Sequence, residues 1–232
     1  MKLYVVVEGS RTEVEVIPSW IYEFNSDMAK LDSPKEEIKN SYYIAAGRGY
    51  PAVVRSTLES AVLDVNQNPD FSDLAVVVDC EDDSRQIRLD EVNRVLLGMG
   101  KVGRIRDGVN IHIITPSPSI EAWILGNRKF ICLNPTRSNL KEFIDHYNVA
   151  SYDPECITLG LNYTNRAKLC FGYVKQAFRE RGIVYSKSSP GEACKRHYLM
   201  GIIDRFEDGD IATFGDMMNL LRRVGANNSS GL

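Results

Sequence analysis

Short apolar runs alternate with amphipathic segments through the first half of the chain, and this alternation restricts the fold more than any other feature. The apolar runs lie at residues 3–7, 42–46, 74–78 and 109–115. Their length and content are typical of strands buried on both faces. Apolar side chains at helical spacing predict helices between them, at 14–24, 52–65 and 87–99. The alternation predicts an α/β fold with a Rossmann-like, mostly parallel sheet flanked by helices.

The second half of the chain has a different pattern. A helix is predicted for "SIEAWIL", with Ser119 as its cap and Trp123 in the core. Further helices are expected at 140–147, 164–180, 193–206 and 214–224, separated by Pro and Gly. We therefore expect an α/β core at 1–127, a helical extension packed on it at 128–224, and a flexible polar tail at 225–232. Residues 28–40 are expected to form a loop or weak helix, and Pro18 to delay or kink the first helix.

Composition excludes several classes of protein. With 232 residues and 44% hydrophobic content, the chain can form one large domain, with or without a smaller appendage. No apolar run reaches the roughly eighteen residues of a membrane helix, and the first residues do not resemble a signal peptide, so a cytoplasmic protein without membrane contact is expected. The five cysteines are scattered, which argues against disulfides and thiolate zinc sites. A net charge of −3 is compatible with a metal-dependent nuclease, whose ions supply positive charge.

Two of the predicted strands lead directly into carboxylates. Glu8 follows the first strand in "VVVEGSRTE", and Asp79 follows the third in "VVVDCEDD". Ligands of parallel sheets bind beyond the carboxyl ends of the strands. In an extended segment Asp79, Glu81 and Asp83 would share a face, and Glu8 would face them if the two strands were neighbours. The alternative is that these are solvated loops whose acids cap the following helices.

Clustered carboxylates repel one another unless a cation joins them. Ligand sets made only of oxygen favour Mg²⁺ or Mn²⁺ over zinc. Such ions activate water and stabilise a leaving oxygen in phosphoryl chemistry. A glutamate that is not fully engaged as a ligand can also move a proton.

Four further residues are weaker candidates. Glu121 lies in the first turn of a predicted helix, where interaction with the helix dipole is an equally good explanation. We expect it to converge with Glu8 and Asp79 at one rim of the sheet. Arg48 stands between two glycines that could let the backbone approach phosphate, or simply form a turn. Arg166 and Lys168 are candidate contacts to a nucleic-acid backbone, or part of a solvated helix face.

The acidic segments resemble the TOPRIM domain of primases, type II topoisomerases and OLD-type nucleases, and most of all its RloB-like branch from bacterial restriction and phage-defence loci. The likeness lies in E-G-x-x-T-E from Glu8 to Glu13, in Asp79 with Glu81, and in "SPSIEAWIL". It covers roughly residues 3–125. Glu81 departs from the D-x-D of the family, and Asp83 is the alternative ligand.

The resemblance implies a Mg²⁺- or Mn²⁺-dependent nuclease acting in antiphage defence, with an ATPase encoded nearby as its partner. The implied catalytic residues are Glu8, Asp79 and Glu81. The possible metal ligands are Glu8, Asp79, Glu81, Asp83, Glu13 and Glu121. RNA, including tRNA, and DNA both stay open as substrates, as does the oligomeric state. The alternative function is a non-catalytic TOPRIM-fold sensor or binding module that regulates a partner ATPase.

Overall fold

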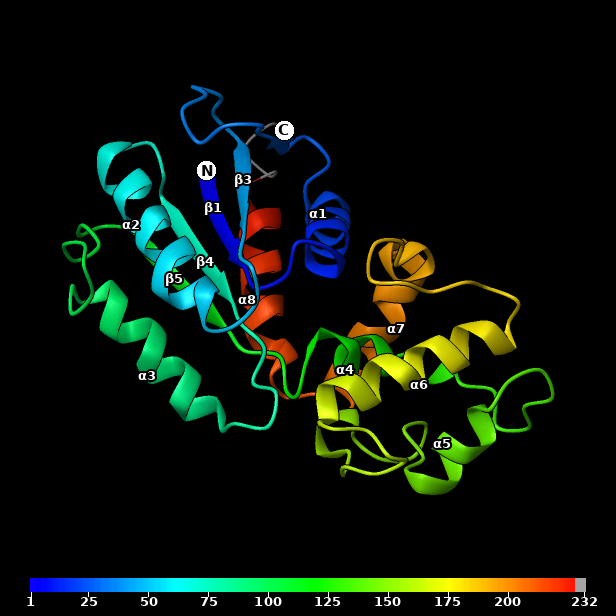
Figure 1. Ribbon diagram of the computed structural model, residues 1–232. Coiled ribbons are helices and arrows are strands. Elements are labelled where there is room, and N and C mark those ends of the chain that lie inside the picture. Colours follow the sequence, from blue (N-terminus) through cyan, green and yellow to red (C-terminus); the bar gives the residue numbers. More distant parts are fainter. Residues whose placement is uncertain (228–232) are drawn as a thin grey trace. The chain divides into compact units, whose positions relative to one another are not determined.

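A parallel five-stranded sheet forms the centre of the first of two compact units in the computed structural model, which describes residues 1–227 (Figure 1). The strand order is β2-β3-β1-β4-β5. The strands are β1 (Lys2–Val7), β2 (Ala29–Lys30), β3 (Ser41–Ala46), β4 (Asp73–Val77) and β5 (Asn110–Ile114). This confirms the predicted α/β class with a Rossmann-like sheet.

The order of the strands reverses beside β1. The chain runs from β1 to β3 on one side, then crosses back to β4 on the other side. In the register, Val7 of β1 is paired with Ala46 of β3 and with Val77 of β4. Parallel sheets bind ligands at such a reversal point, outside the carboxyl ends of the strands. The strands preceding Glu8 and Asp79 are neighbours, which meets the condition that the sequence left open.

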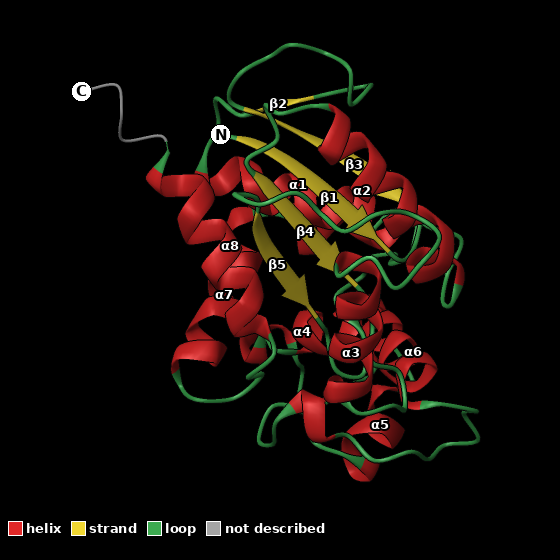
Figure 2. Ribbon diagram, turned by 90° about the vertical axis from the view of Figure 1, so that its left-hand side faces the viewer, coloured by secondary structure: helices red, strands yellow, loops and turns green. Residues whose placement is uncertain are grey.

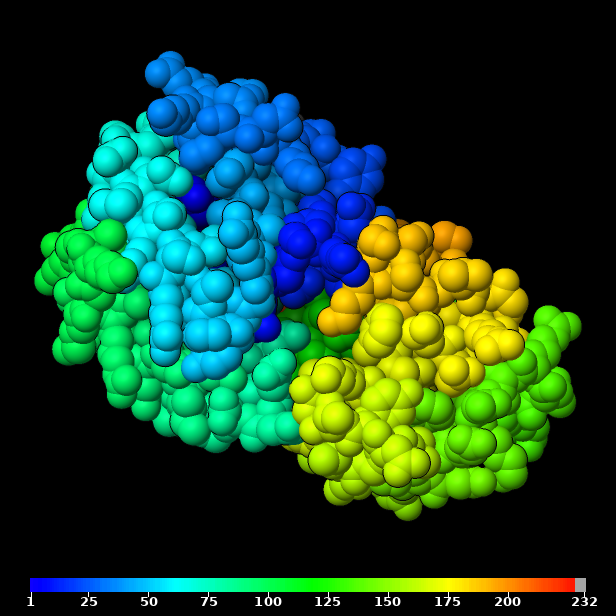
Figure 3. Space-filling model, in the orientation of Figure 1, coloured from blue at the N-terminus to red at the C-terminus, as the bar shows by residue number. Residues whose placement is uncertain are grey.

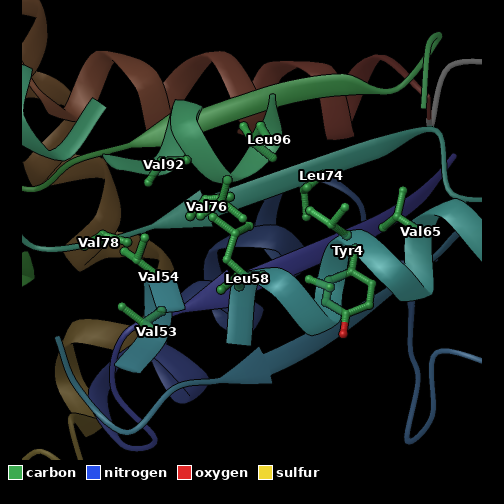
Figure 4. Close-up of a cluster of buried hydrophobic side chains, with 14 of the residues drawn as sticks. Tyr4, Val53, Val54, Leu58, Val65, Leu74, Val76, Val78, Val92 and Leu96 are labelled. Carbon is green, nitrogen blue, oxygen red and sulfur yellow. The ribbon is translucent and has the colours of Figure 1, made fainter. Parts of the chain in front are cut away.

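Helices cover both faces of the sheet, as right-handed crossovers in two opposite directions require. On one face lie α2 (Leu58–Gln67) and α3 (Arg85–Leu96), and on the other α1 (Thr12–Phe24) and α8 (Phe214–Ala226) (Figures 1 and 2). Figure 4 shows the core under α2 and α3. Its labelled members are Tyr4, Val53, Val54, Leu58, Val65, Leu74, Val76, Val78, Val92 and Leu96. The intervening residues of β1 and β4 are buried too, which explains the continuous apolar runs.

Local differences from the expected elements have local causes. The start of the predicted helix at 52–65 is a π-helix, η1 (Val53–Thr57), that leads into α2. Strand β2 lies in the stretch expected to be loop or weak helix. It has two residues, too few to show a periodicity. Pro18 does not delay α1, which begins at Thr12 and buries Val16, Ile17 and Trp20 around the proline.

The second compact unit consists of Asp79–Asp83 and Pro116–Gly215. Its helices are α4 (Ile120–Leu125), α5 (Leu140–His146), α6 (Arg166–Glu180) and α7 (Arg196–Glu207), with the short turns η2 (Arg128–Phe130), η3 (Pro154–Cys156) and η4 (Gly191–Cys194). Helix α4 is buried throughout and packs on α6 and α7. Trp123 is fully buried, as expected of a core residue, and its indole nitrogen donates to Thr213 Oγ1 at 2.9 Å.

The bounds of the two units differ from the predicted 1–127 and 128–224. Helix α4 belongs to unit 2 because its partners are α6 and α7. The described residues from Asp216 to 227 belong to unit 1. There, Arg223 of α8 donates to Asp73, and the Val224 carbonyl accepts from Asn25. Gly225 and Ala226 are still helical, so the predicted tail at 225–232 starts too early, and its residues 228–232 lie outside the described part. Among the described residues, no helix has the length and apolar character needed to cross a membrane.

Candidate functional site

The predicted site residues are divided between the two units. Glu8, Glu13 and Arg48 belong to unit 1. The group in unit 2 comprises Asp79, Glu81, Asp83, Glu121, Arg166 and Lys168.

Glu8 begins the loop after β1, at the reversal point of the strand order. Its side chain is half-buried, and its Oε1 accepts a hydrogen bond from the Tyr50 amide at 3.2 Å. Its carbonyl accepts the Gly49 amide at 3.1 Å. The loop that follows β3 therefore holds both the backbone and the carboxylate of Glu8. Tyr50 was missed at the sequence level, because a backbone donor carries no signal in its side-chain type.

The contact between Glu13 and Gly9 explains the spacing of E-G-x-x-T-E. Glu13 is buried in the first turn of α1, and its Oε1 accepts the Gly9 amide at 3.0 Å. A Cβ at Gly9 would lie 2.8 Å from Glu13 Oε2. The carboxylate closes the loop after β1 as in a capping box, so this spacing has a structural explanation.

The loop around Arg48 has the build of a tight turn. Gly49 has a φ of +83°, and a Cβ at Gly47 would lie 2.8 Å from Val53 Cβ and 2.9 Å from the Glu8 carbonyl. Arg48 itself is exposed, and over residues 1–227 its guanidinium takes part in no hydrogen bond or ion pair. The glycines serve the turn, and the arginine is directed to solvent.

In unit 2, Asp79–Asp83 runs beside the segment that leads into α4. Cys80 and Glu81 donate their amides to the carbonyls of Pro116 and Pro118, at 2.9 and 2.7 Å. Asp79 Oδ1 accepts the amide of Ile120, the first residue of α4, at 3.2 Å. Asp79 thus caps a helix as in the structural alternative, although the helix lies 41 residues further along the chain.

Asp79–Asp83 is a turn, so the expected extended segment is wrong. Glu81 has a φ of +52°, in the left-handed region that non-glycine residues rarely adopt, and the Asp83 amide bonds to the Cys80 carbonyl at 3.0 Å. The alternation that would give Asp79, Glu81 and Asp83 one common face is therefore lost. A strained backbone of this kind persists only where its surroundings hold it. Here the Glu81 amide donates to the Pro118 carbonyl, and the Glu81 carbonyl accepts from Arg166.

Glu121 is a buried carboxylate at the start of α4, with 1% of its surface exposed. The Ser119 hydroxyl donates to its Oε2 at 2.8 Å, and Lys187 Nζ lies 3.8 Å from its Oε1. Ser119 does occupy the position before the helix, as predicted, but its hydroxyl bonds to Glu121 and Asp79 accepts the amide instead. Asp79 and Glu121 therefore come together at the first turn of α4.

Cys170 of α6 completes this acidic neighbourhood and was not identified from the sequence. Burial raises the pKa of its thiol, and the negative charges of Glu121 and Asp79 raise it further, against the effect of Arg166. The thiol therefore stays protonated at neutral pH. Its position in the amphipathic pattern of α6 looks like that of any core residue, which is why sequence inspection passes over it.

Arg166 and Lys168 have different surroundings. Arg166, at the start of α6, donates through Nη2 to the Glu81 carbonyl at 3.0 Å, and its Nε lies 3.3 Å from Asp82 Oδ1. Lys168 is exposed and bonds through Nζ to Thr164 Oγ1 at 3.0 Å. The structure thus gives Arg166 the role of holding the acidic turn.

The chemistry of the predicted ligands suits a hard divalent cation, because every one of them is a carboxylate. Their arrangement within each unit is less complete. Over residues 1–227, neither unit contains a group of three or more His, Cys, Asp or Glu side chains placed to hold a metal ion. Each unit therefore provides suitable oxygen donors without a complete coordination sphere of its own.

No match to the chain was found among protein-family models, curated proteins or solved structures. The resemblance to TOPRIM and RloB-like proteins therefore stays a prediction from the sequence motifs.

Proposed function

We propose that the protein is a Mg²⁺- or Mn²⁺-dependent nuclease of the TOPRIM, RloB-like type that hydrolyses phosphodiesters in antiphage defence. The observation that carries the proposal is that β1 and β4 are parallel neighbours at the reversal point of the sheet, and that each leads directly into carboxylates. RNA, such as tRNA, and DNA are the two candidate substrates. The resemblance supports an ATPase encoded nearby as the controlling partner.

The carboxylates have separate roles in this proposal. Asp79 and Glu81 would hold the metal ion, and Glu8 would be a further ligand or would transfer the proton. The Tyr50 amide fixes Glu8 Oε1, which orients the carboxylate. The chemistry that a bound ion would supply is activation of the attacking water and stabilisation of the leaving oxygen.

A binding module without catalysis is the second candidate. It is favoured because several of the acids make hydrogen bonds that stabilise the local structure. Asp79 caps α4, and Glu13 closes the loop after β1. Such a protein would bind a nucleic acid or regulate a partner ATPase without cleaving anything.

Cleavage by the purified protein distinguishes the two functions. Labelled tRNA, single-stranded RNA, and single- and double-stranded DNA are incubated with Mg²⁺, Mn²⁺ or chelator. We expect metal-dependent cleavage of at least one substrate, and its loss in Asp79→Asn. Asp70→Asn is the matched control, because Asp70 is an exposed aspartate just before β4, at the other end of that strand.

A thermal melt of the same proteins tests metal binding apart from catalysis. An ion that binds only the folded protein stabilises it. The melting temperature of the wild type and of Asp70→Asn should rise in millimolar Mg²⁺ or Mn²⁺, and that of Asp79→Asn should not. Cleavage that persists in chelator, or in Asp79→Asn, would contradict the metal-dependent mechanism. Nucleic-acid binding without cleavage would leave the binding module.

A further inference from the structure

A cavity of about 340 Å³ opens in unit 1 between the segment that follows β3 and helix α3. Figure 3 shows the surfaces of η1 and α3 side by side on this face. Pro51, Val54 and Val95 provide its apolar wall. Its rim carries three cationic side chains, Arg55, Arg94 and Lys101.

The three cations are directed to solvent. All three residues are exposed, and in the described part of the chain their charged groups form no hydrogen bond or ion pair. Many other arginines of the protein are bound to acids or carbonyls, for example Arg104 to Asp107 and Arg106 to the Val65 carbonyl. Positive charge at this rim is therefore available to a ligand.

The two acids that line the cavity are already engaged. Glu91 accepts the Tyr50 hydroxyl at 2.6 Å and pairs with the buried Arg88 at 3.0 Å. Glu59 accepts the Lys101 amide at 3.0 Å. The cavity is thus lined by three cations and two acids, and the charge of one acid, Glu91, is balanced by the buried Arg88. The rim therefore carries an excess of positive charge.

Tyr50 connects the cavity to Glu8. Its amide donates to Glu8 Oε1, while its side chain lines the cavity. The Arg88 guanidinium lies over the Tyr50 ring, 3.8 Å from the ring centre. That ring face is occupied and does not serve as a stacking platform for a base. The contacts that the cavity offers to a strand are its rim cations, which suit phosphate.

We infer that this cavity binds the phosphodiester backbone of a nucleic-acid strand through Arg55, Arg94 and Lys101. The inference rests on the proposed function in taking nucleic acid as the ligand. It adds a binding surface, on the side of the sheet covered by α2 and α3, to the acids at the strand ends. Binding through phosphate alone should be insensitive to base sequence and should weaken steeply with salt.

Fluorescence anisotropy with labelled oligo(U) and oligo(A) in chelator tests the inference without cleavage. The double variant Arg55→Ala/Arg94→Ala should bind both strands about tenfold or more weaker than wild type. Each lost phosphate contact lowers the salt slope for a single strand by about 0.7, so the double variant should lose about 1.4. Arg222→Ala is the matched control, because Arg222 is an exposed arginine on α8, at the opposite face of the sheet, and it should bind like wild type.

Inorganic phosphate and a mononucleotide are then tested as competitors of the labelled strand. Both should compete only weakly, because each engages the rim at a single phosphate. Saturation by either at low concentration, with no gain from strand length, would overturn the assignment to a strand. So would wild-type affinity in the double variant, an equal loss in Arg222→Ala, or no strand binding by the wild type. A protein that binds in this way but never cleaves would refute the nuclease and leave the cavity assignment standing.

Discussion

At the scale of single residues, Glu8 and Glu13 differ in what holds them. Glu8 is half-buried at the strand end and bonds through its carboxylate to a backbone amide of another loop. Glu13 is buried and bonds to the amide of Gly9, four residues earlier. The same residue type at two positions of one motif therefore serves two purposes, of which only that of Glu13 is explained by local structure alone.

Substitution of each glutamate by glutamine separates the two purposes. Glu8→Gln removes the charge and nearly all of the proton affinity, so the cleavage rate should fall by roughly a hundredfold or more if Glu8 moves a proton. Glu13→Gln retains an oxygen that can accept the Gly9 amide, so its rate should stay within about threefold of wild type, as expected away from general acid–base chemistry. Rates are compared at equal folded concentration. An equal, severe loss in both variants would make Glu13 a metal ligand, and wild-type activity in Glu8→Gln would remove Glu8 from the mechanism.

At the scale of secondary-structure elements, the start of α6 holds the acidic turn in place. Arg166 bonds to the Glu81 carbonyl and to Asp82, next to the left-handed backbone of Glu81. Lys168, two residues later, bonds to Asn165 and Thr164 at the start of its own helix. These two cations were equivalent candidates in the sequence, and the fold gives them different roles.

Hydrogen exchange can detect this difference. In Arg166→Ala, the amides of Cys80–Asp83 should exchange about tenfold faster or more, because a lost hydrogen bond to a charged group is worth on the order of 1.5 kcal/mol. Lys168→Ala should leave exchange in this segment unchanged. The Arg166 contact would be irrelevant to the turn if both variants exchanged like wild type.

At the scale of the whole molecule, contacts between distant parts of the chain hold the C-terminal helix α8 against the sheet. Asp73, at the start of β4, is fully buried and lies 2.9 Å from His112 Nε2 and 3.3 Å from Arg223 Nη2 of α8. Burial raises the pKa of the Asp73 carboxyl, but hydrogen bonds from His112, Arg223 and Ser72 outweigh burial and hold the pKa below its ordinary value. A carboxyl with a lowered pKa stabilises the fold above its unfolded pKa, and this contribution is lost as the pH falls through the folded value.

Adjacent arginines of α8 provide the test. Arg223→Ala should lower the free energy of unfolding at pH 7 by about 1 to 2 kcal/mol, since its partner is buried but Arg223 itself is partly exposed. The difference from wild type should shrink as the pH falls below the ordinary aspartate pKa of about 4 and then through the lower folded pKa of Asp73. Arg222→Ala should stay within about 0.5 kcal/mol of wild type. Urea denaturation at several pH values measures all three proteins, and a loss that does not depend on pH would exclude the ion pair as its cause.

The sequence by itself determined the features that local periodicity records. Apolar runs and helical spacing located the four longer strands and most of the helices, because burial repeats along a chain with the period of its secondary structure. Parallel topology then followed from the alternation of strands and helices, and with it the carboxylates at the ends of β1 and β4. Strand β2 was not predicted, because a strand of two residues shows no periodicity.

Only the tertiary structure decided which side chains meet. Asp79 caps a helix 41 residues away, and Arg166 reaches Asp82 across 84 residues. The cations of Arg55, Arg94 and Lys101 surround one cavity although they come from separate segments. The division into units, with α8 returned to the sheet, has the same origin. Hydrogen bonds and ion pairs between distant segments depend on how the elements pack, and packing leaves no periodic trace in the sequence of either partner.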